Sequence, residues 1–258
     1  MPNPSPQDAA RRLLVLRALI PYAHGQPPKQ VWAEIFPNWS KEEQENFFQH
    51  FKKLGQDIAS HLRKAGVWDY LSPKEDRFFH CYPQDMQDLE KINMVWRLES
   101  AIVLLWALTL CPEFPPFDKQ AESNVLKNIA LSDGANLVAN ARLRSLQELE
   151  EKRSRAELWH WRSRTRQLIE ERQPLRAPPQ FKSYDEIVRF TARAGKENGT
   201  SSFEIIDEDF AVKGKAYRDL TNDEWSEIRS ITVERHFALN WLCGYAPENK
   251  WDETPLGT

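Results

Sequence analysis

Glycine and cysteine are scarce in this sequence. Only nine of the 258 residues are glycine, too few for a β-sandwich, a β-barrel or an enzyme built on glycine-rich phosphate loops, all of which need many tight turns. The three cysteines, Cys81, Cys111 and Cys243, are far apart and odd in number. They form neither a disulfide framework nor a Cys-x-x-Cys metal pair, a pattern typical of buried thiols in a reducing compartment.

The usual motifs of catalysis and metal binding are absent as well. The sequence has no GxSxG nucleophile elbow, no phosphate-binding P-loop and no dinucleotide-binding GxGxxG, and its six histidines form no HExxH pair. A Cys–His nucleophile pair need not be close in sequence, but buried inert thiols are the favoured interpretation. We therefore expect neither a metal ion nor a cofactor.

No segment has the pattern of a membrane anchor or a secretory signal. The most apolar stretch, residues 100–111, is shorter than the about 20 residues that a spanning helix needs. In the N-terminal segment, Asp8 precedes the first arginines and Arg17 interrupts the apolar part. We expect a cytoplasmic protein that does not contact a membrane.

Charge is nearly balanced, with 35 Lys and Arg against 38 Asp and Glu and a net charge of −3. This balance excludes a polycation that holds nucleic acid by counterion release, although a local basic stripe remains compatible with it. The 41% of hydrophobic residues is ordinary for a globular protein. Ten tryptophans supply large, rigid packing units and candidate contact anchors.

A repeated pattern of helix starts predicts a mainly α-helical protein. A Ser or Thr followed three residues later by Glu forms a capping box, which satisfies two free backbone N–H groups. The pattern begins at Ser40, Ser72, Ser145, Ser183 and Thr221, and Ser5 with Pro6 and Asp8 is a variant. The expected helices are residues 6–20 (ending at Pro21), 28–36, 41–64, 73–80, 84–110, 119–130, 131–139, 146–172, 184–194 and 222–243.

The chain changes character after residue 172. We predict a compact multi-helix main domain whose first part is residues 1–172, and whose C-terminal helix and tail are residues 221–258. Between them, residues 173–220 form an inserted arm with a short helix and a β-hairpin, the β structure lying near residues 195–220. Turns are expected at 207–209 and 213–215.

The arm is acidic and carries aromatic residues. From Glu204 to Glu224, seven acidic residues stand against three basic ones. An acidic, aromatic, projecting segment suits fast, steered binding to a basic protein surface. The predicted contact residues are Phe203, Glu204, Asp207, Glu208, Asp209, Phe210 and Tyr217. The alternative is a decorated loop without a partner.

Two polar groups interrupt apolar helices and predict a buried network. Glu99 lies beside the most apolar stretch, and Glu234-Arg235-His236 precedes a second apolar run. A buried charge needs a partner, so we expect the two helices to meet. The predicted structural cluster is Trp96, Arg97, Glu99, Arg235, His236, Asn240 and Trp241. The alternative is an active site of Glu99, Arg235 and His236, with the histidine as general base.

The helix expected at residues 146–172 combines arginines with tryptophans, a composition that suits nucleic-acid binding. Six glutamates on the same helix lie within reach of its arginines. At spacings of three and four residues they form salt bridges. A solvated, salt-bridged helix face is the favoured interpretation.

Four strings together resemble a known bacterial family. They are WRLE…LLWAL (residues 96–108), RLRSLQELE (142–150), ERHFALNWLCGY (234–245) and the WD…T ending. The set is similar to domain of unknown function 4272, most specifically in ERH-x-ALNWL and more weakly before Gly66. The family's tail usually carries further acids after the WD pair, whereas here the end reads ETPLGT. Residues from about 174 to 220 resemble an insertion relative to shorter members. The resemblance implies a compact α-helical fold without an assigned activity, with the polar cluster as a structural signature.

Three functions remain open from the sequence. Proteins similar to this one also occur near bacterial genes for secreted toxins, and this resemblance implies a cytoplasmic immunity protein. Such a protein would bind and neutralise a toxin, for example a nuclease delivered as a type VI secretion effector. Its partner would be that protein toxin, with no direct nucleic-acid contact. The alternatives are an enzyme of an unrecognised helical class that uses the Glu99, Arg235 and His236 cluster, and a helical nucleic-acid-binding protein. We favour the non-enzymatic immunity protein.

Overall fold

The computed structural model describes residues 3–26, 28–81, 85–175, 178–197 and 204–257, and these are mainly α-helical, as the sequence predicts. The helices are α1 (Pro6–His24), α2 (Lys29–Ile35), α3 (Lys41–Lys64), α4 (Pro73–His80), α5 (Asp88–Ala107), α6 (Gly134–Ala139), α7 (Leu146–Glu170), α8 (Tyr184–Glu197) and α9 (Asn222–Leu242). The strands are β1 (Ile205–Ile206), β2 (Asp209–Val212) and β3 (Lys215–Ala216). No helix in this described part has the length and hydropathy that crossing a membrane would require.

The predicted capping boxes form at the helix starts. At α3, the Glu43 N–H donates to the Ser40 hydroxyl (3.2 Å) and the Ser40 N–H donates to the Glu43 carboxylate (2.6 Å). The same reciprocal pair begins α1, α4, α7 and α9. At α8 the Glu186 N–H donates to the Ser183 hydroxyl, as in a capping box. The Glu186 carboxylate, however, accepts from the backbone N–H of Lys182 rather than from that of Ser183. Such caps contribute about 1 kcal/mol each, so local sequence defines most helix starts.

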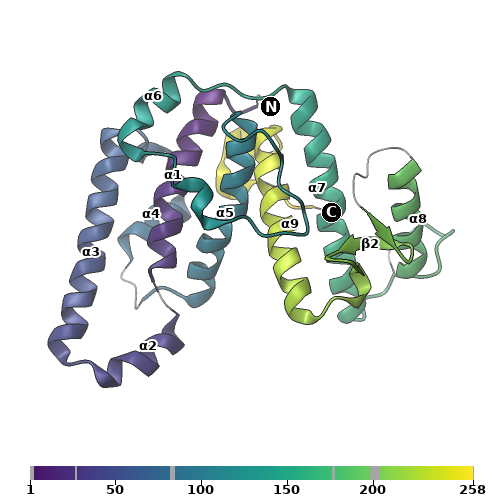
Figure 1. The fold of residues 1–258 in the computed structure, drawn as a ribbon, viewed down its shortest axis with the longest axis horizontal. Coiled ribbons are helices and arrows are strands. Elements are labelled where there is room, and N and C mark those ends of the chain that lie inside the picture. Colours follow the sequence, from purple (N-terminus) through teal and green to yellow (C-terminus); the bar gives the residue numbers. More distant parts are fainter. Residues whose placement is uncertain (1–2, 27, 82–84, 176–177, 198–203, 258) are drawn as a thin grey trace.

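The core lies where α1, α5, α9 and α7 pack side by side in that order (Figure 1). The apolar stretch of α5 is buried from Leu98 to Ala107. It contacts α1 on one side and α9 on the other, and α9 in turn packs against α7. The C-terminal helix therefore forms part of the same core as the N-terminal helix.

Three helix predictions were wrong, those for residues 6–20, 84–110 and 119–130. α1 continues through Pro21 to His24, because Tyr22 and Ala23 are buried and hold the last turn in place. α5 begins at Asp88 rather than residue 84. It ends at Ala107, where Thr109 takes a positive φ of 61° and the Leu110 N–H donates back to the Leu105 carbonyl.

The segment at 119–130 is not an α-helix, and only a short 3₁₀ turn, Ser123–Leu126, forms within it. Two buried side chains of the core bind backbone groups at its start. The Ala121 N–H donates to Glu99, and the Lys119 carbonyl accepts from Arg235. These bonds hold the backbone away from a regular helix.

The predicted hairpin is part of a three-stranded antiparallel sheet with the order β1-β2-β3. Both connections are two-residue turns with positive φ, at Asp207 and Glu208 (48° and 63°) and at Lys213 and Gly214 (51° and 77°). This conformation matches the twist of paired strands and suits short polar residues and glycine. The two turns fix the register, in which Ile206 pairs with Asp209.

Candidate functional site

The arm (residues 173–220) is attached to α7 by a buried ion pair. The Arg162 guanidinium donates two hydrogen bonds to the Asp209 carboxylate, at 2.7 and 2.6 Å. The same carboxylate accepts the backbone N–H groups of Phe210 (2.8 Å) and Arg218 (3.0 Å). Asp209 is fully buried. Its four hydrogen bonds fix the first residue of β2 and the turn after β3 on the same helix.

The burial of β2 corrects part of the predicted contact surface. Asp209, Phe210 and Tyr217 are all fully buried, so they support the arm and cannot touch a partner. Phe210 and Tyr217 pack with Trp159 of α7 in a separate apolar cluster. Burial raises the pKa of Tyr217 to about 12. The expectation of a projecting segment is therefore wrong for its central strand.

The other predicted contact residues have different positions. Glu204 and Asp207 are exposed. Glu208 is half-exposed and forms ion pairs with Arg189 and Arg193 of α8, which lower the pKa of its carboxyl, the Arg193 hydrogen bond most of all. Phe203 lies outside the described residues.

Three exposed carboxylates form what we term the acidic edge: Asp207, Asp219 and Asp223. Arg218 donates from its guanidinium to the Asp207 carbonyl (2.9 Å), which brings the β1–β2 turn beside the segment that carries Asp219 and Asp223. Among the described residues, none of the three carboxylates has an ion-pair partner. Nearby Glu224, by contrast, binds Lys215 (2.7 Å).

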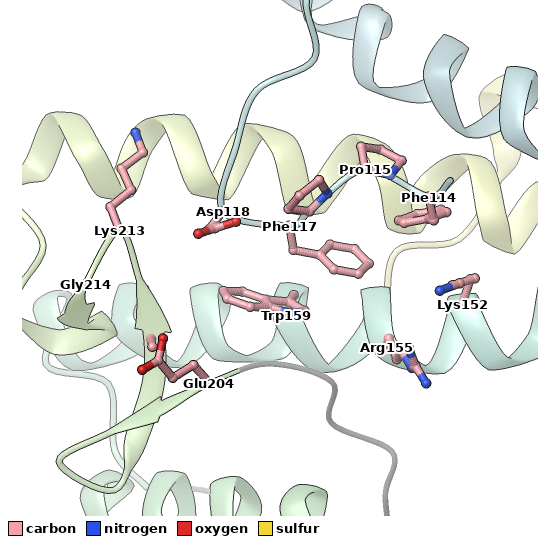
Figure 2. Close-up of a pocket in the computed structure, with 12 residues that line it drawn as sticks. Phe114, Pro115, Phe117, Asp118, Lys152, Arg155, Trp159, Glu204, Lys213 and Gly214 are labelled. Carbon is pink, nitrogen blue, oxygen red and sulfur yellow. The ribbon is translucent and has the colours of Figure 1, made fainter. Parts of the chain in front are cut away.

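A cavity of about 280 Å³ lies between the arm, α7 and the connector, by which we mean residues 111–121. Phe117 stacks on Trp159, with ring centroids 5.9 Å apart. Figure 2 shows Lys152 and Arg155 at one end of this aromatic pair, with Glu204 and Lys213 at the other. Both charge signs and two apolar rings therefore face one recess, a lining that suits a polypeptide side chain better than a simple ion.

Glu99 and Arg235 form a second buried ion pair, as the sequence predicts. Arg235 donates to one Glu99 oxygen from Nε (2.8 Å) and Nη2 (2.7 Å), and both side chains are fully buried. Its remaining donors bind the connector at the carbonyls of Pro115 (3.1 Å), Pro116 (2.5 Å) and Lys119 (2.9 Å). Burial lowers the pKa of Arg235, and the Glu99 charge opposes that shift. The pair holds the connector against the core.

His236 lies next to Arg235 in sequence but contacts a different element. Its Nδ1 is 2.9 Å from Nδ1 of His160 on α7, so one ring donates and the other accepts. Burial lowers the pKa of His160 to about 4 and that of His236 to about 3, with nearby positive charge adding to the burial effect. Both rings are therefore neutral at pH 7.

The remaining members of the predicted cluster each have structural partners. Arg97 pairs with Glu234 (3.1 Å), whose carboxylate also accepts from Ser100. Asn240 and Trp241 donate to the carbonyls of Pro255 (2.8 Å) and Asn249 (2.9 Å) and so hold the C-terminal tail. Trp96 packs, half-buried, against the cluster around Trp159.

The burial of these side chains weighs against the alternative that they form an active site. Glu99, Arg235 and His236 are fully buried, so a substrate could reach them only if the core rearranged. Burial raises the pKa of the Cys243 thiol to about 12, which keeps this sulfur protonated and unreactive. Within the described residues, no group of three or more His, Cys, Asp or Glu side chains could hold a metal ion.

The arginines of α7 are largely engaged, as the salt-bridge interpretation predicts. Arg153 binds Glu150 (2.6 Å) and Glu157 (3.0 Å), and Arg166 binds Glu170 (2.9 Å), all at spacings of three or four residues. Arg162 is buried against Asp209. These pairs reduce the positive charge that the helix could offer to a phosphate backbone.

A family model described as "Domain of unknown function (DUF4272)" matches residues 2–178, well over half of the chain. The chain belongs to the DUF4272 family. A search of curated proteins and a search of solved structures each found no match.

The DUF4272 model matches a different part of the chain from the part in which the resemblance was expected to be strongest. It includes the segment before Gly66, where the resemblance was expected to be weak. It leaves out residues 234–245, whose ERH-x-ALNWL string was expected to be the most specific part. The match ends at residue 178, close to the predicted start of the arm. Most of the arm (residues 179–220) and all of α9 therefore lie outside the matched DUF4272 segment, although α9 packs in the core.

Two features of the site were not predicted. The pairing of Arg162 with Asp209 was not predicted, because each residue lies among other charges in the sequence and nothing local marks it as buried. The burial of Arg12, which binds Glu75 (2.5 Å) and the Tyr70 carbonyl (2.7 Å), was not predicted either. Here a signal was present: Arg12 adjoins the apolar run of α1, just as Glu99 adjoins that of α5.

Proposed function

We propose that this DUF4272 protein is a non-enzymatic immunity protein that binds and neutralises a secreted bacterial toxin. The observation that carries the proposal is the acidic edge, Asp207, Asp219 and Asp223, exposed and without ion-pair partners among the described residues. Unpaired surface carboxylates are available to a basic partner, whereas paired ones must first lose a partner.

Rigid attachment of the arm supports this role. Asp209 fixes the sheet to α7 through four hydrogen bonds, and two two-residue turns fix the positions of the strands. A surface that is ordered before binding loses less conformational entropy when the complex forms. The acidic edge is therefore presented in one geometry, which favours a specific complex over loose charge attraction.

The cavity beside the arm supplies a recess for an anchoring residue of the partner. Phe117 and Trp159 offer apolar faces, and Glu204 and Asp118 offer carboxylates at its border. Arginine and aromatic side chains are the usual anchors of protein interfaces, and this lining accommodates either.

The charge of the edge indicates the class of toxin. Enzymes that act on nucleic acids carry basic surfaces for their polyanionic substrate. An acidic inhibitor can cover such a surface, so a nuclease delivered by a type VI secretion system is the target we propose. Neutralisation would then take place in the cytoplasm of the producing cell.

The test is co-expression with the product of the neighbouring gene, followed by purification through a tag on the immunity protein. The proposal predicts a one-to-one complex and loss of the neighbour's toxicity. Reversing the edge (Asp207→Lys, Asp219→Lys and Asp223→Lys together) should weaken binding at least tenfold, because three favourable charge contacts become repulsive. Most of the change at low salt should appear in the association rate.

A matched control carries the same charge change elsewhere. Glu42, Asp57 and Asp69 are exposed, lie in the N-terminal half and have no ion-pair partner among the described residues. Their triple replacement by lysine should leave binding unchanged. Equal affinity of both triple variants would remove the acidic edge from the interface, and a toxin that stays active in the complex would refute the immunity role.

A further inference from the structure

A second cavity lies between α1, α5 and residues 120–127, which include the end of the connector. Its volume is about 580 Å³. Its apolar lining consists of Ile20, Pro21, Val95, Leu98, Ala121 and Leu126. None of its lining residues belongs to the arm or to the cavity beside it. Cavities of this size and apolar character accommodate small organic ligands.

The charged groups of this cavity all have the same sign. Arg17 and Lys127 supply its positive charges, the His24 ring also lines it, and no carboxylate is among its described lining residues. Arg17 donates its Nε–H to the Ile129 carbonyl (3.1 Å), which orients the guanidinium. Its terminal nitrogens and the Lys127 ammonium have no acceptor among the described residues. Two cationic side chains beside an apolar recess are complementary to an anionic ligand with an apolar body.

The walls of the cavity are fixed without a ligand. The Ala121 N–H donates to the buried Glu99 carboxylate (2.7 Å), and Leu126 is buried in the core cluster. The opposite walls belong to α1 and α5, which pack directly on each other. A recess with walls held in this way resists collapse, so the apolar surface stays available to a ligand.

We propose that this cavity binds a small amphiphilic carboxylate, with its acyl chain among the apolar residues and its carboxylate between Arg17 and Lys127. Guanidinium and ammonium groups form strong, charge-assisted hydrogen bonds to carboxylates. The acyl chain removes apolar surface from water. A cationic amphiphile would gain the same apolar contact but would meet the two like charges of Arg17 and Lys127. This site is separate from the acidic edge and does not depend on the proposed toxin binding.

The experiment compares two probes of equal chain length and opposite charge, decanoate and decyltrimethylammonium, by isothermal titration calorimetry with the full chain below the micelle-forming concentration. The proposal predicts one site for decanoate and binding of the cation at least tenfold weaker. Lys127→Glu should weaken decanoate about tenfold, because an attractive contact becomes repulsive. Lys53→Glu is the matched control, since Lys53 is exposed on α3 and lines neither cavity described above, and it should leave the affinity unchanged.

A second variant tests the apolar part of the site. Val95 is half-buried on α5, and Val95→Trp should fill the recess and abolish decanoate binding without changing the helical content measured by circular dichroism. The proposal is overturned if decanoate shows no saturable binding, if both probes bind equally, or if Lys127→Glu and Lys53→Glu have the same effect. Unchanged decanoate binding by folded Val95→Trp would place the ligand elsewhere and overturn it too.

Discussion

Two buried arginine–carboxylate pairs hold the irregular parts of this molecule, and they do so in different ways. The pair of Glu99 and Arg235, which we term the connector clamp, joins α5 to α9. Arg235 also donates to three carbonyls of the connector. The arm clamp, Arg162 with Asp209, joins α7 to β2, and there the carboxylate makes the extra bonds to backbone N–H groups. In one clamp the cation organises the loop, and in the other the anion does.

The difference reflects which backbone groups each segment leaves unpaired. The connector is rich in proline, which has no N–H, so its free groups are carbonyls and need a donor. The arm presents N–H groups at the start of β2 and after β3, and these need an acceptor. In both cases a buried charge is stable because several hydrogen bonds compensate for its loss of water.

The largest effect is expected from breaking the connector clamp. Glu99→Gln removes the negative charge beside fully buried Arg235, leaving a positive charge uncompensated in the core. Loss of one partner of a buried pair costs about 3–5 kcal/mol, and we expect this decrease in the free energy of unfolding in urea. Glu90→Gln, which breaks the exposed pair with Arg77, is the control and should cost less than about 1 kcal/mol. Similar values for the two variants would show that the connector clamp is not a stabilising contact.

The His160–His236 pair lies between the two clamps and contributes a pH-dependent part of the stability. His160 shares α7 with Arg162 of the arm clamp, and His236 shares α9 with Arg235 of the connector clamp. Folding lowers both imidazole pKa values, to about 4 and about 3, so the folded state binds fewer protons than the unfolded state below pH 6.5. Stability is therefore highest above pH 6.5 and falls as the pH drops. Between pH 7 and pH 5 the loss should be about 2 kcal/mol for each histidine.

The measurement is urea unfolding at a series of pH values for the wild type and for His160→Gln with His236→Gln. The double variant should show a much flatter dependence between pH 7 and pH 5. Carboxylates contribute mainly at lower pH, as for Glu224, whose pKa the Lys215 contact and the helix cap lower to about 2. An unchanged slope in the double variant would mean that the pair does not carry the pH dependence.

Breaking the arm clamp should have a smaller and more local effect. Asp209→Asn keeps the shape of the side chain but loses the charge that faces Arg162, and hydrogen bonds to charged groups contribute about 1.5–3 kcal/mol. We expect a loss of about 2 kcal/mol, confined to the arm. Hydrogen exchange should accelerate for the β2 and β3 amides and stay slow in α5. Equal acceleration in both would show that the arm and the core unfold together.

The helical part of this fold could be predicted because its signals are local. Ser40 and Glu43 lie three residues apart, and Gly66, with a φ of 67°, follows the end of α3, so both ends of that helix were predicted correctly. The pairing of Glu99 with Arg235 was also accessible, because each charge adjoins an apolar run. The continuation of α1 through Pro21 was not, because it depends on the burial of Tyr22 and Ala23 in the assembled core.

The arm shows where reasoning from sequence stops. Asp207, Glu208 and Asp209 are consecutive acids, yet the first is exposed, the second is paired on the surface and the third is fully buried. The two-residue turn makes Asp209 the first residue of β2, and the position of α7 beneath it decides its burial. Nothing in the sequence places α7 there, so acidity alone was a poor guide to which residues a partner could touch.

The smallest effect is expected at Glu208, the neighbour of Asp209. Glu208→Gln removes the surface ion pairs with Arg189 and Arg193 but leaves the arm clamp intact. Exposed pairs contribute little, because water already solvates both charges. Hydrogen exchange in β2 and β3 should therefore match the wild type, in contrast to Asp209→Asn one residue away. If Glu208→Gln loosened the strands as much as Asp209→Asn does, the surface contact with α8 rather than the buried pair with α7 would hold the arm in place.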